Sequence, residues 1–410
     1  MASTPAGIPA GIPAGISDGI LAGIRVLDFG RYIAGPFCAA LLADLGAEVI
    51  RVERVGGGDD RTLMPATGSG EGALFLHANR NKQAITLDLS VEAGRAVARR
   101  LIADSDVVVA NFPPRVLGQL GLDYAAVKAV KPDIILTTAT AFGFEGPYRN
   151  AIGFDGVGQA MSGAIHLSGE PGMPYRAAVS YVDYATALSC AYGTLAAVVR
   201  RLRTGEGSHV EASLLGTALN MMNPILIEEA TGSRTRVPTG NRSPIAGPSD
   251  LFATRDGWVI VQVIGQDMFE RWTDLVGAPE LRADPRFADD MARGDNGAPL
   301  SALMARWCAG RDSADCLETL RQARIAAGPV LSPRQVMAAD NGLGPHFFDW
   351  IAVPGADRPI PLSRPPARLS GMEGPAPRHP PAVGEHTDAV LSRAGYAPDE
   401  IAALRGAGVI

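Results

Sequence analysis

Short apolar runs alternate with amphipathic segments along the first half of the chain. The runs in GIRVLDFG (23–30), AITLDLS (84–90) and PDIILTTATAFG (132–143) are bounded by glycine, proline or polar residues, which is typical of buried strands. Segments of about ten to fifteen residues with helical spacing of their apolar side chains separate these runs. This alternation predicts βαβ units and therefore an α/β fold built on a parallel sheet.

Two of the intervening segments indicate where helices begin and end. PFCAALLADLGAEVIRVE (36–53) predicts a helix opened by proline and stopped by Gly46, followed by a strand. VEAGRAVARRLIADSDVVVANF (91–112) predicts an amphipathic helix capped by Ser90 and then a strand over Val107–Asn111.

The carboxyl ends of the predicted strands are rich in glycine, proline, asparagine and arginine. They read FGRYIAGP, VERVGGGDD, LDLS, NFPP and TAFGFEGP. Ligands of parallel α/β sheets bind beyond these ends. None of the five contains G-x-G-x-x-G or a Walker A loop, so a dinucleotide or nucleoside-triphosphate site is disfavoured, although an elongated anionic ligand still fits.

The second half of the chain has a different texture. SDLFATRDGWVIVQVI (249–264) predicts a hairpin turned at Asp256-Gly257, and helical segments follow to about Ala327. The proline-rich stretch Pro354–Pro381 predicts an extended strap over the surface rather than a packed element. We therefore predict the domain bounds as a flexible tail (1–20), a large domain (21–223), a smaller α+β domain (224–328), and a strap with the rest of the large domain (329–410).

The helix after Ser180 carries a single carboxylate at its beginning. In SYVDYATALSCAYGTLAAVVRRLRTGEG (180–207), Asp183 is the only acidic residue before the closing Gly-Glu-Gly, and a basic cluster precedes Gly205. Aspartate is a favoured N-cap and its charge suits the positive end of the helix dipole, so the local pattern favours capping. A reactive carboxylate is the alternative, and the local pattern does not decide between them.

The composition is that of an ordinary globular enzyme. Of the 410 residues, 47% are hydrophobic and 20% are charged, and the net charge of −6 argues against a general nucleic-acid binder. The four cysteines lack C-x-x-C spacing and the six histidines form no H-x-x-x-H motif, so we expect neither a disulfide framework nor a metal site. We expect a cytoplasmic protein without membrane association, because the Pro-Ala-Gly-Ile repeats of residues 1–20 contain no basic residue and are broken by glycine and proline.

The sequence resembles the class III CoA-transferases, also called the CaiB/BaiF family. The resemblance runs through GIRVLDFGRYIAGPFCAALLADLGAEVIRVER, ANRNKQAITLDL, DVVVANFPPRVLGQLGL, GFDGVGQAMSG, the segment around Asp183, and GEHTDAVLSRAGY. These motifs occur in the family's order and cover nearly everything after the tail. The family implies a Rossmann-like large domain, an inserted smaller domain and an interlocked homodimer.

The resemblance assigns Asp183 to the family's catalytic aspartate. That carboxylate attacks an acyl-CoA thioester, and the CoA then returns to form an aspartyl-CoA thioester that a second carboxylic acid resolves. Asp155 stands where the family has another acidic residue beside the nucleophile, and a simple turn residue is the alternative.

The resemblance also implies residues that hold coenzyme A, all of them at predicted strand ends. They are Ile33, Ala34, Arg54, Leu87, Asp88, Leu89, Ser90, Asn111 and Phe112. Without the resemblance, Arg54 would be taken as a solvated surface charge and Phe112 as core packing.

Departures from the family pattern bear on the substrate. Gln119 replaces a CoA-contacting arginine, and Ile152 replaces a basic residue for which Arg149 is close enough to compensate. TGNRSPIAGP (239–248) replaces a glycine loop that selects the acyl group, so formyl or oxalyl chemistry is not implied. Arg176 and the 240–248 loop are candidates for acid recognition, because arginine pairs bidentately with carboxylates.

Three other functions are weighed against CoA transfer. An α-methylacyl-CoA racemase of the same family uses a Gly-His-Asp triplet, and Phe154 in the GFD triplet here cannot exchange a proton. A non-catalytic CoA-binding protein would have no chemical need for Asp183. An NAD-dependent oxidoreductase would lack its glycine fingerprint.

Overall fold

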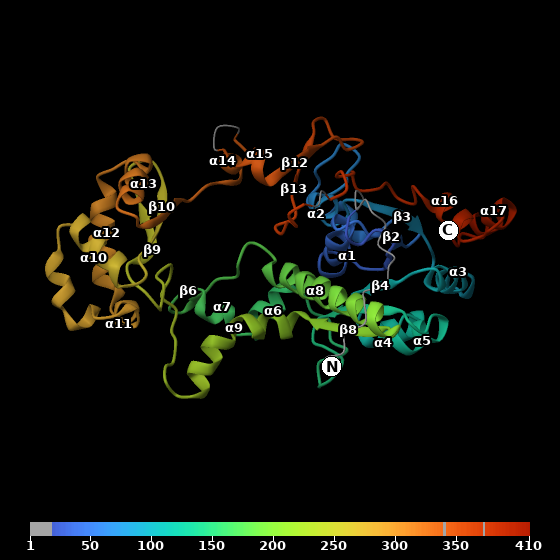
Figure 1. Cartoon of the computed structure of the whole chain (residues 1–410), viewed down its shortest axis with the longest axis horizontal. Helices are drawn as coiled ribbons and strands as arrows, with labels where there is room; N and C mark the ends of the chain where they lie inside the picture. Colours follow the sequence, from blue (N-terminus) through green and yellow to red (C-terminus); the bar gives the residue numbers. More distant parts are fainter. Residues whose placement is uncertain (1–18, 339–341, 372–373) are drawn as a thin grey trace, which may run out of the picture. The chain divides into compact units, whose positions relative to one another are not determined.

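The computed structural model describes residues 19–338, 342–371 and 374–410, and its contacts divide the chain into two compact units (Figure 1). The first unit comprises residues up to Gly158, Val179–Asn220 and Phe347–Ile410, and the second comprises Gln159–Ala178 and Met221–His346. The division falls within helices α6 (Asp155–Met161) and α9 (Leu214–Ala230). The predicted domain bounds at 224 and 328 differ from these divisions and stay predictions, and residues 1–18 of the predicted tail lie outside the described residues.

A six-stranded parallel sheet forms the centre of the first unit, as the alternation of strands and helices predicts. The strand order is β3-β2-β1-β4-β5-β8. The strands are β1 (Arg25–Asp28), β2 (Glu48–Glu53), β3 (Lys82–Thr86), β4 (Val107–Ala110), β5 (Ile135–Thr140) and β8 (Ser208–Ser213). This order is that of the doubly wound dinucleotide-binding fold, in which strand order reverses at the first strand.

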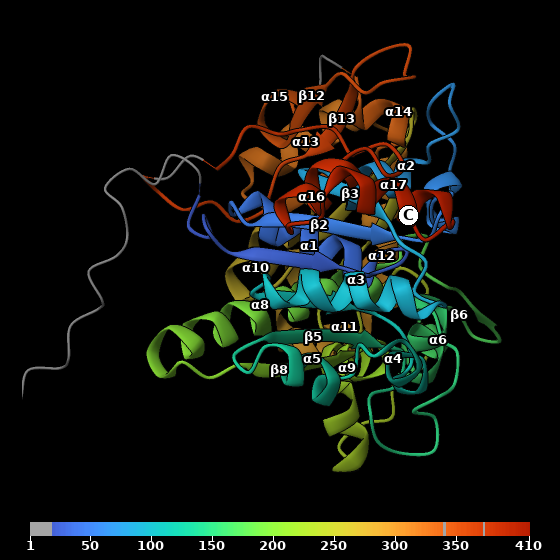
Figure 2. The ribbon, with the colours of Figure 1, turned by 90° about the vertical axis from the view of Figure 1, so that its right-hand side faces the viewer.

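Helices cover both faces of this sheet, which is why its strands read as continuous apolar runs. On one face, Val26 and its neighbours pack with α1 (Ala34–Asp44) and α8 (Tyr181–Thr204). On the other, Leu27 and its neighbours pack with α3 (Glu92–Ala103), α5 (Tyr124–Val130) and α16 (Thr387–Arg393). Figure 2 looks onto this second face, with α3 and α16 in front of the strands.

The remaining elements of the first unit are short. They are α2 (Ala73–Ala78), α4 (Pro114–Leu120), α17 (Pro398–Gly406), a 3-10 turn at Asp59–Thr62, and an antiparallel pair, β12 (Phe348–Ile351) and β13 (Ile360–Ser363). This pair, together with the burial of Pro380 and Pro381, corrects the prediction of an extended surface strap over Pro354–Pro381. The prediction of a Ser90 cap is also wrong: Val91 is the N-cap of α3 and makes no side-chain cap, while Ser90 donates from its N–H and Oγ to Asp88.

The second unit is built on a three-stranded antiparallel sheet, β11-β10-β9. The predicted hairpin at Asp256-Gly257 is confirmed, because β9 (Ser249–Ala253) and β10 (Trp258–Gln262) pair across it. One side of the sheet packs on helices through a core that includes Phe269 and Trp272. The other elements are α7 (Ala164–Leu167), β6 (Gly169–Glu170), β7 (Met173–Pro174), α10 (Gln266–Leu275), 3-10 turns at Pro279–Ala283 and Pro285–Phe287, α11 (Asp290–Asp295), α12 (Gly297–Ala309), α13 (Ser313–Gln322), β11 (Ala326–Pro329), α14 (Pro333–Val336) and α15 (Gly344–Phe347).

Candidate active site

Helix α8 positions Asp183 in its first turn. The helix begins at Tyr181 and ends where Gly205 adopts φ 73°, the left-handed conformation that favours glycine after a helix. Its N-cap residue is Ser180, whose side chain makes no capping hydrogen bond. The prediction that Asp183 caps α8 is therefore wrong, since Asp183 lies inside the helix.

Asp155 supplies the cap instead, from a different segment of the chain. Its Oδ1 atom accepts hydrogen bonds from the backbone N–H groups of Val182 (2.8 Å) and Asp183 (3.3 Å). The side chain is buried, with 3% of the residue exposed. Two of the N–H groups that every helix leaves without an intrahelical partner at its beginning are satisfied in this way.

The carboxylate of Asp183 is left in an unusual electrostatic position. Burial and, as the smaller cause, the nearby charge of Asp155 together raise its pKa from 3.8 to about 7. Among the described residues, no donor makes a hydrogen bond to this carboxylate. A carboxylate that is largely desolvated and unpaired is more basic and more nucleophilic than one in water, and Asp183 is partly buried.

Aromatic side chains surround the beginning of α8. Tyr184 follows the aspartate, and its ring packs edge-on against Phe37 at 5.0 Å and against His77 at 5.7 Å between ring centroids. Burial lowers the pKa of His77 to about 4, so this imidazole is neutral at physiological pH. The sequence analysis missed His77, because its position in α2, far along the chain from Asp183, gives no signal of proximity.

The carboxyl end of β1 is tied to the end of β4. Asn111 accepts from the backbone N–H of Arg31 and donates to its carbonyl, both at 2.7 Å. Tyr32 follows with a positive φ of 62°, a strained conformation for a residue other than glycine, and its ring meets that of Phe154 edge-on at 5.9 Å. The side chain of Asn111 thus holds the loop that leads into Ile33.

The predicted CoA residues lie along one edge of the sheet, each after a strand of the first unit. Ile33 and Ala34 are buried at the start of α1, and Phe112 is half-buried after β4. Arg54 follows β2 and is exposed, with Nε donating to the Gly57 carbonyl at 2.7 Å and an ion pair to Asp59. The segment from Leu87 to Ser90 follows β3, with Leu87 buried and the three residues after it more exposed.

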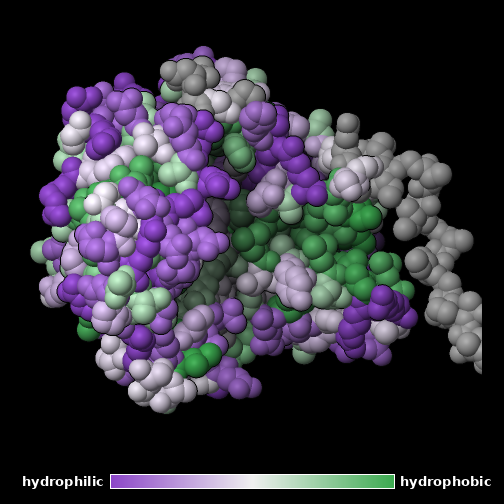
Figure 3. Space-filling view, turned by 60° about the vertical axis from the view of Figure 1, so that its left-hand side comes forward, coloured by the Kyte–Doolittle hydropathy of each residue, from purple (hydrophilic) through white to green (hydrophobic). Residues whose placement is uncertain are grey.

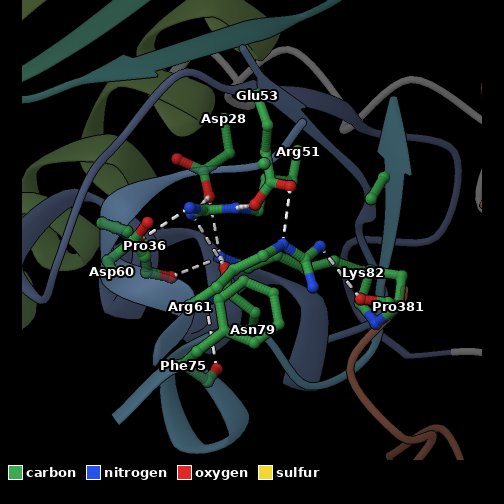
Figure 4. A network of polar contacts seen from close by, with 12 residues as sticks. Asp28, Pro36, Arg51, Glu53, Asp60, Arg61, Phe75, Asn79, Lys82 and Pro381 are labelled. Atoms are coloured by element: carbon green, nitrogen blue, oxygen red, sulfur yellow. Dashed lines mark hydrogen bonds and ion pairs between the residues drawn. The ribbon is translucent and has the colours of Figure 1, made fainter. Parts of the chain in front are cut away.

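A buried network of charges lies beneath this edge, and Figure 4 shows its members pointing toward one another. The fully buried guanidinium of Arg51 contacts Glu53 at 2.5 Å and Asp60 at 2.7 Å. Lys82 donates to Asp28 at 2.7 Å, and burial lowers its pKa to about 8. These charges pair with one another, which offsets the high cost of burying them, while Oδ1 of Asp60 has no hydrogen-bond partner among the described residues.

The network reaches the loops that carry the predicted site. Asp60 also accepts from the backbone N–H of Tyr32 at 3.1 Å, and Arg51 donates to the Gly30 carbonyl at 3.2 Å. Arg61 donates to Glu53 at 2.8 Å and to the Pro381 carbonyl at 3.1 Å, which ties in the C-terminal segment. The sequence analysis did not single out this network, although an arginine inside the apolar run EVIRVE was an available signal.

The chain belongs to CoA-transferase family III, whose sequence model matches residues 21–387. It is therefore a CoA-transferase of the CaiB/BaiF type, as the motifs predicted. The similarity extends over almost the whole chain in both sequence and structure, so the parallel α/β fold and the general class of reaction are shared.

Characterised relatives and a solved structure support this assignment. The chain is 33% identical over 395 residues to succinyl-CoA–D-citramalate CoA-transferase of Chloroflexus aurantiacus, covering 94% of this chain and 97% of that protein. It is 32% identical over 385 residues to succinate–glutarate CoA-transferase of Agrobacterium fabrum, covering 90% and 94%. A crystal structure of a CaiB/BaiF family protein from Brucella suis matches with a TM-score of 0.79 and 32% identity, covering 92% of this chain and 100% of that one.

Proposed function

We propose that this enzyme moves coenzyme A between two carboxylic acids through an aspartyl-CoA thioester on Asp183. The observation that carries the proposal is the state of the Asp183 carboxylate, whose pKa is raised to about 7 by burial and by Asp155. It has no hydrogen-bond donor among the described residues. A carboxylate that served only to stabilise the fold would be paired or solvated.

The reaction exchanges acyl groups without consuming or releasing a proton overall. An oxygen of ionised Asp183 attacks the thioester carbonyl of the donor, and the carbon–sulfur bond breaks to give an acyl-aspartyl anhydride and CoA thiolate. The thiolate then attacks the aspartyl carbonyl, which releases the first acid as its carboxylate and leaves aspartyl-CoA. The acceptor carboxylate repeats the two steps in reverse, which frees Asp183 and gives the new acyl-CoA.

The surroundings of Asp183 favour the attack in two ways. Asp155 fixes the first turn of α8 through the N–H groups of Val182 and Asp183, so the nucleophile starts from a defined position. The aromatic rings of Phe37, His77 and Tyr184 border the same turn and keep water away from the helix beginning.

The edge of the sheet in the first unit supplies the groups that would hold coenzyme A. The backbone at Ile33 and Ala34, the segment Leu87–Ser90, and Asn111 with Phe112 follow neighbouring strands. Arg54 offers a positive charge to phosphate, although it must exchange its ion pair with Asp59 to do so. The half-buried ring of Phe112 offers a surface against which an adenine or the pantetheine chain can pack.

Succinyl-CoA is the donor that the similar proteins favour. The relatives from C. aurantiacus and A. fabrum are named for transfers that involve succinate, with citramalate or glutarate as the other acid. We infer that this enzyme likewise works between short dicarboxylic acids. The second acid differs between the names of those two relatives, which are about equally similar to this chain, so we infer that particular residues rather than overall similarity set the acceptor here.

The enzyme works as a homodimer in this proposal, and α8 supplies part of the interface. Leu188, Tyr192, Val199 and Leu202 lie on one side of α8 and are 46–77% exposed. Apolar side chains also gather on one face of the molecule in Figure 3. By length and composition alone α8 could cross a membrane, but 44% of its most apolar window is buried inside the structure, as in a core helix. A second copy of the chain is the partner that such a stripe fits best.

Intact-mass spectrometry tests the covalent step. The protein is incubated with succinyl-CoA and then treated with or without hydroxylamine, beside Asp183→Ala and Asp183→Asn. We expect an adduct of coenzyme A or succinyl mass on the wild type, cleaved by hydroxylamine and absent from both variants. The site is located by digestion and fragmentation of the labelled protein.

Two outcomes would contradict the proposal. An adduct of unchanged yield on Asp183→Asn would place the nucleophile elsewhere. No adduct from succinyl-CoA, glutaryl-CoA or acetyl-CoA, together with deuterium uptake at the α-carbon of a 2-methylacyl-CoA, would establish a racemase instead.

A further inference from the structure

A cavity of about 410 Å³ lies within the second unit, apart from the residues assigned to catalysis and CoA binding above. It is bordered by the β6–β7 hairpin with the residues that follow it, and by the loop after α9. The polar residues that line it are Ser168, Tyr175, Arg176, Arg236, Thr239, Asn241 and Arg242. Its volume is in the range of sites that bind small molecules.

Hydrogen bonds between the two borders fix the shape of the cavity. The backbone N–H of Gly240 donates to the Gly169 carbonyl at 2.7 Å, which joins the loop to the hairpin. Within the loop, the Thr239 hydroxyl donates to the Arg242 carbonyl at 2.7 Å. Ala177 is held by Gln159, whose Oε1 accepts its N–H at 3.1 Å. The walls are therefore largely formed before any ligand arrives.

One of the three lining arginines has a structural role. Arg236 donates two hydrogen bonds to Glu228, at 2.6 and 2.7 Å, and a third to the Pro244 carbonyl at 2.5 Å. These contacts hold the loop after α9 against the helix itself. The guanidinium of Arg236 is satisfied by the protein and is not available to a ligand.

The other two arginines are different. Among the described residues, neither the guanidinium of Arg176 nor that of Arg242 has a hydrogen-bond or ion-pair partner. The cavity lining contains no aspartate or glutamate, and Glu170, the acidic residue of β6 in the hairpin, is not part of it. Two unpaired cations in one small cavity attract an anion, because their mutual repulsion is relieved when it binds.

We propose that this cavity binds a short dicarboxylic acid, with Arg176 and Arg242 each pairing with one of its carboxylates. A guanidinium offers two parallel N–H groups that match a carboxylate, so two arginines discriminate a diacid from a monoacid of the same length. The hydroxyl groups of Ser168 and Thr239 donate to the Ala164 and Arg242 carbonyls, so their oxygens can only accept, as from the hydroxyl group of a hydroxylated diacid. A role of this cavity in choosing the acceptor acid rests on the proposed CoA transfer, whereas binding of the diacid to the cavity does not.

Isothermal titration calorimetry of the full chain without any acyl-CoA tests the site. Succinate, glutarate and the monoacid butyrate are titrated into the wild type, Arg176→Ala, Arg242→Ala and Arg176→Lys. The matched control is Arg321→Ala, which removes an exposed arginine of the same unit that pairs with Glu318 on α13. We expect diacid binding by the wild type and Arg321→Ala, a loss of about tenfold or more in each alanine variant, and partial recovery in Arg176→Lys.

Three results would overturn the proposal. These are no diacid binding by the wild type, butyrate binding as tight as succinate binding, and unchanged succinate affinity in both alanine variants. Adenosine 3′,5′-bisphosphate is titrated in parallel. If it displaces succinate at a lower concentration than glutarate does, the cavity is assigned to a phosphate group instead. Labelling of Asp183 is measured separately. A protein that binds succinate but forms no adduct would contradict the proposed function alone, and one that forms an adduct but does not bind succinate would contradict the cavity proposal alone.

Discussion

The Asp155 carboxylate accepts a hydrogen bond from the backbone N–H of Asp183, with 3.3 Å between Oδ1 and N. The carboxylates of Asp155 and Asp183 thus both lie at the beginning of α8, but in different environments. Asp155 is buried and bonded to backbone donors, while the carboxylate of Asp183 has a pKa raised to about 7. Environments that separate two carboxylates in this way commonly assign them different chemical roles.

The rate of adduct formation should depend on pH through the ionisation of Asp183. Only the carboxylate form attacks a thioester, and its pKa is raised to about 7, so the rate should rise with pH through 7 and level off above it. At pH 6 the rate should be about one tenth of the plateau value. Rapid-quench mass spectrometry with succinyl-CoA measures it. A rate that stays constant from pH 5.5 to 8 would show that the pKa of Asp183 is ordinary.

Removing the charge of Asp155 should shift this pH dependence. Asp155→Asn keeps an oxygen that can accept from Val182 and Asp183 but removes the charge that raises the pKa of Asp183. The midpoint should move below 7 yet stay above 3.8, because burial is the larger cause of the shift. Asp123→Asn, which changes the carboxylate cap of α5 in the same way, is the control and should leave the midpoint unchanged. An unchanged midpoint in Asp155→Asn would assign the whole shift to burial.

The buried network should be essential to stability. Arg51→Met removes the fully buried cation that Glu53 and Asp60 share and should cost about 3–5 kcal/mol of the free energy of unfolding. Arg25→Met breaks a partly exposed ion pair with Glu48 and should cost only about 1 kcal/mol. Urea unfolding followed by circular dichroism compares the two. Equal costs would mean that the network is solvated or rearranges.

Charge on the apolar stripe of α8 should disrupt the dimer. Tyr192→Asp and Leu202→Asp place a carboxylate where the side chains are 77% and 69% exposed, so the monomer should tolerate them while a dimer interface should not. Light scattering should give a dimer mass for the wild type and a monomer mass for the double variant. Val91→Asp changes an exposed apolar residue at the beginning of α3 and should leave the dimer intact. A wild-type monomer, or a double variant that stays dimeric, would remove α8 from the interface.

Local sequence patterns predicted strands of the central sheet in the first unit and helices that connect them. Runs such as the one around Val26 and Leu27 are apolar because both faces of the sheet are covered. Gly205 ends α8 because glycine, unlike other residues, adopts the left-handed conformation without strain. The motifs likewise predicted the family to which the chain belongs, and the assignment of Asp183 as its catalytic aspartate stays a prediction. These features depend on a residue and its near neighbours, or on the order of segments along the chain. The amino-acid sequence gives both kinds of information directly.

The tertiary structure decided what surrounds the nucleophile. Capping of α8 comes from Asp155 and not from Asp183, and the Arg51 network joins residues from three strands and a turn. The unpaired state of Arg176 and Arg242 is likewise a property of two loops that meet in space. The sequence predicted strands and helices of the first unit and led us to propose Asp183 as the reactive carboxylate. Only folding determined its pKa and its partners, because desolvation and charge interactions act over a few ångströms between groups that are far apart along the chain.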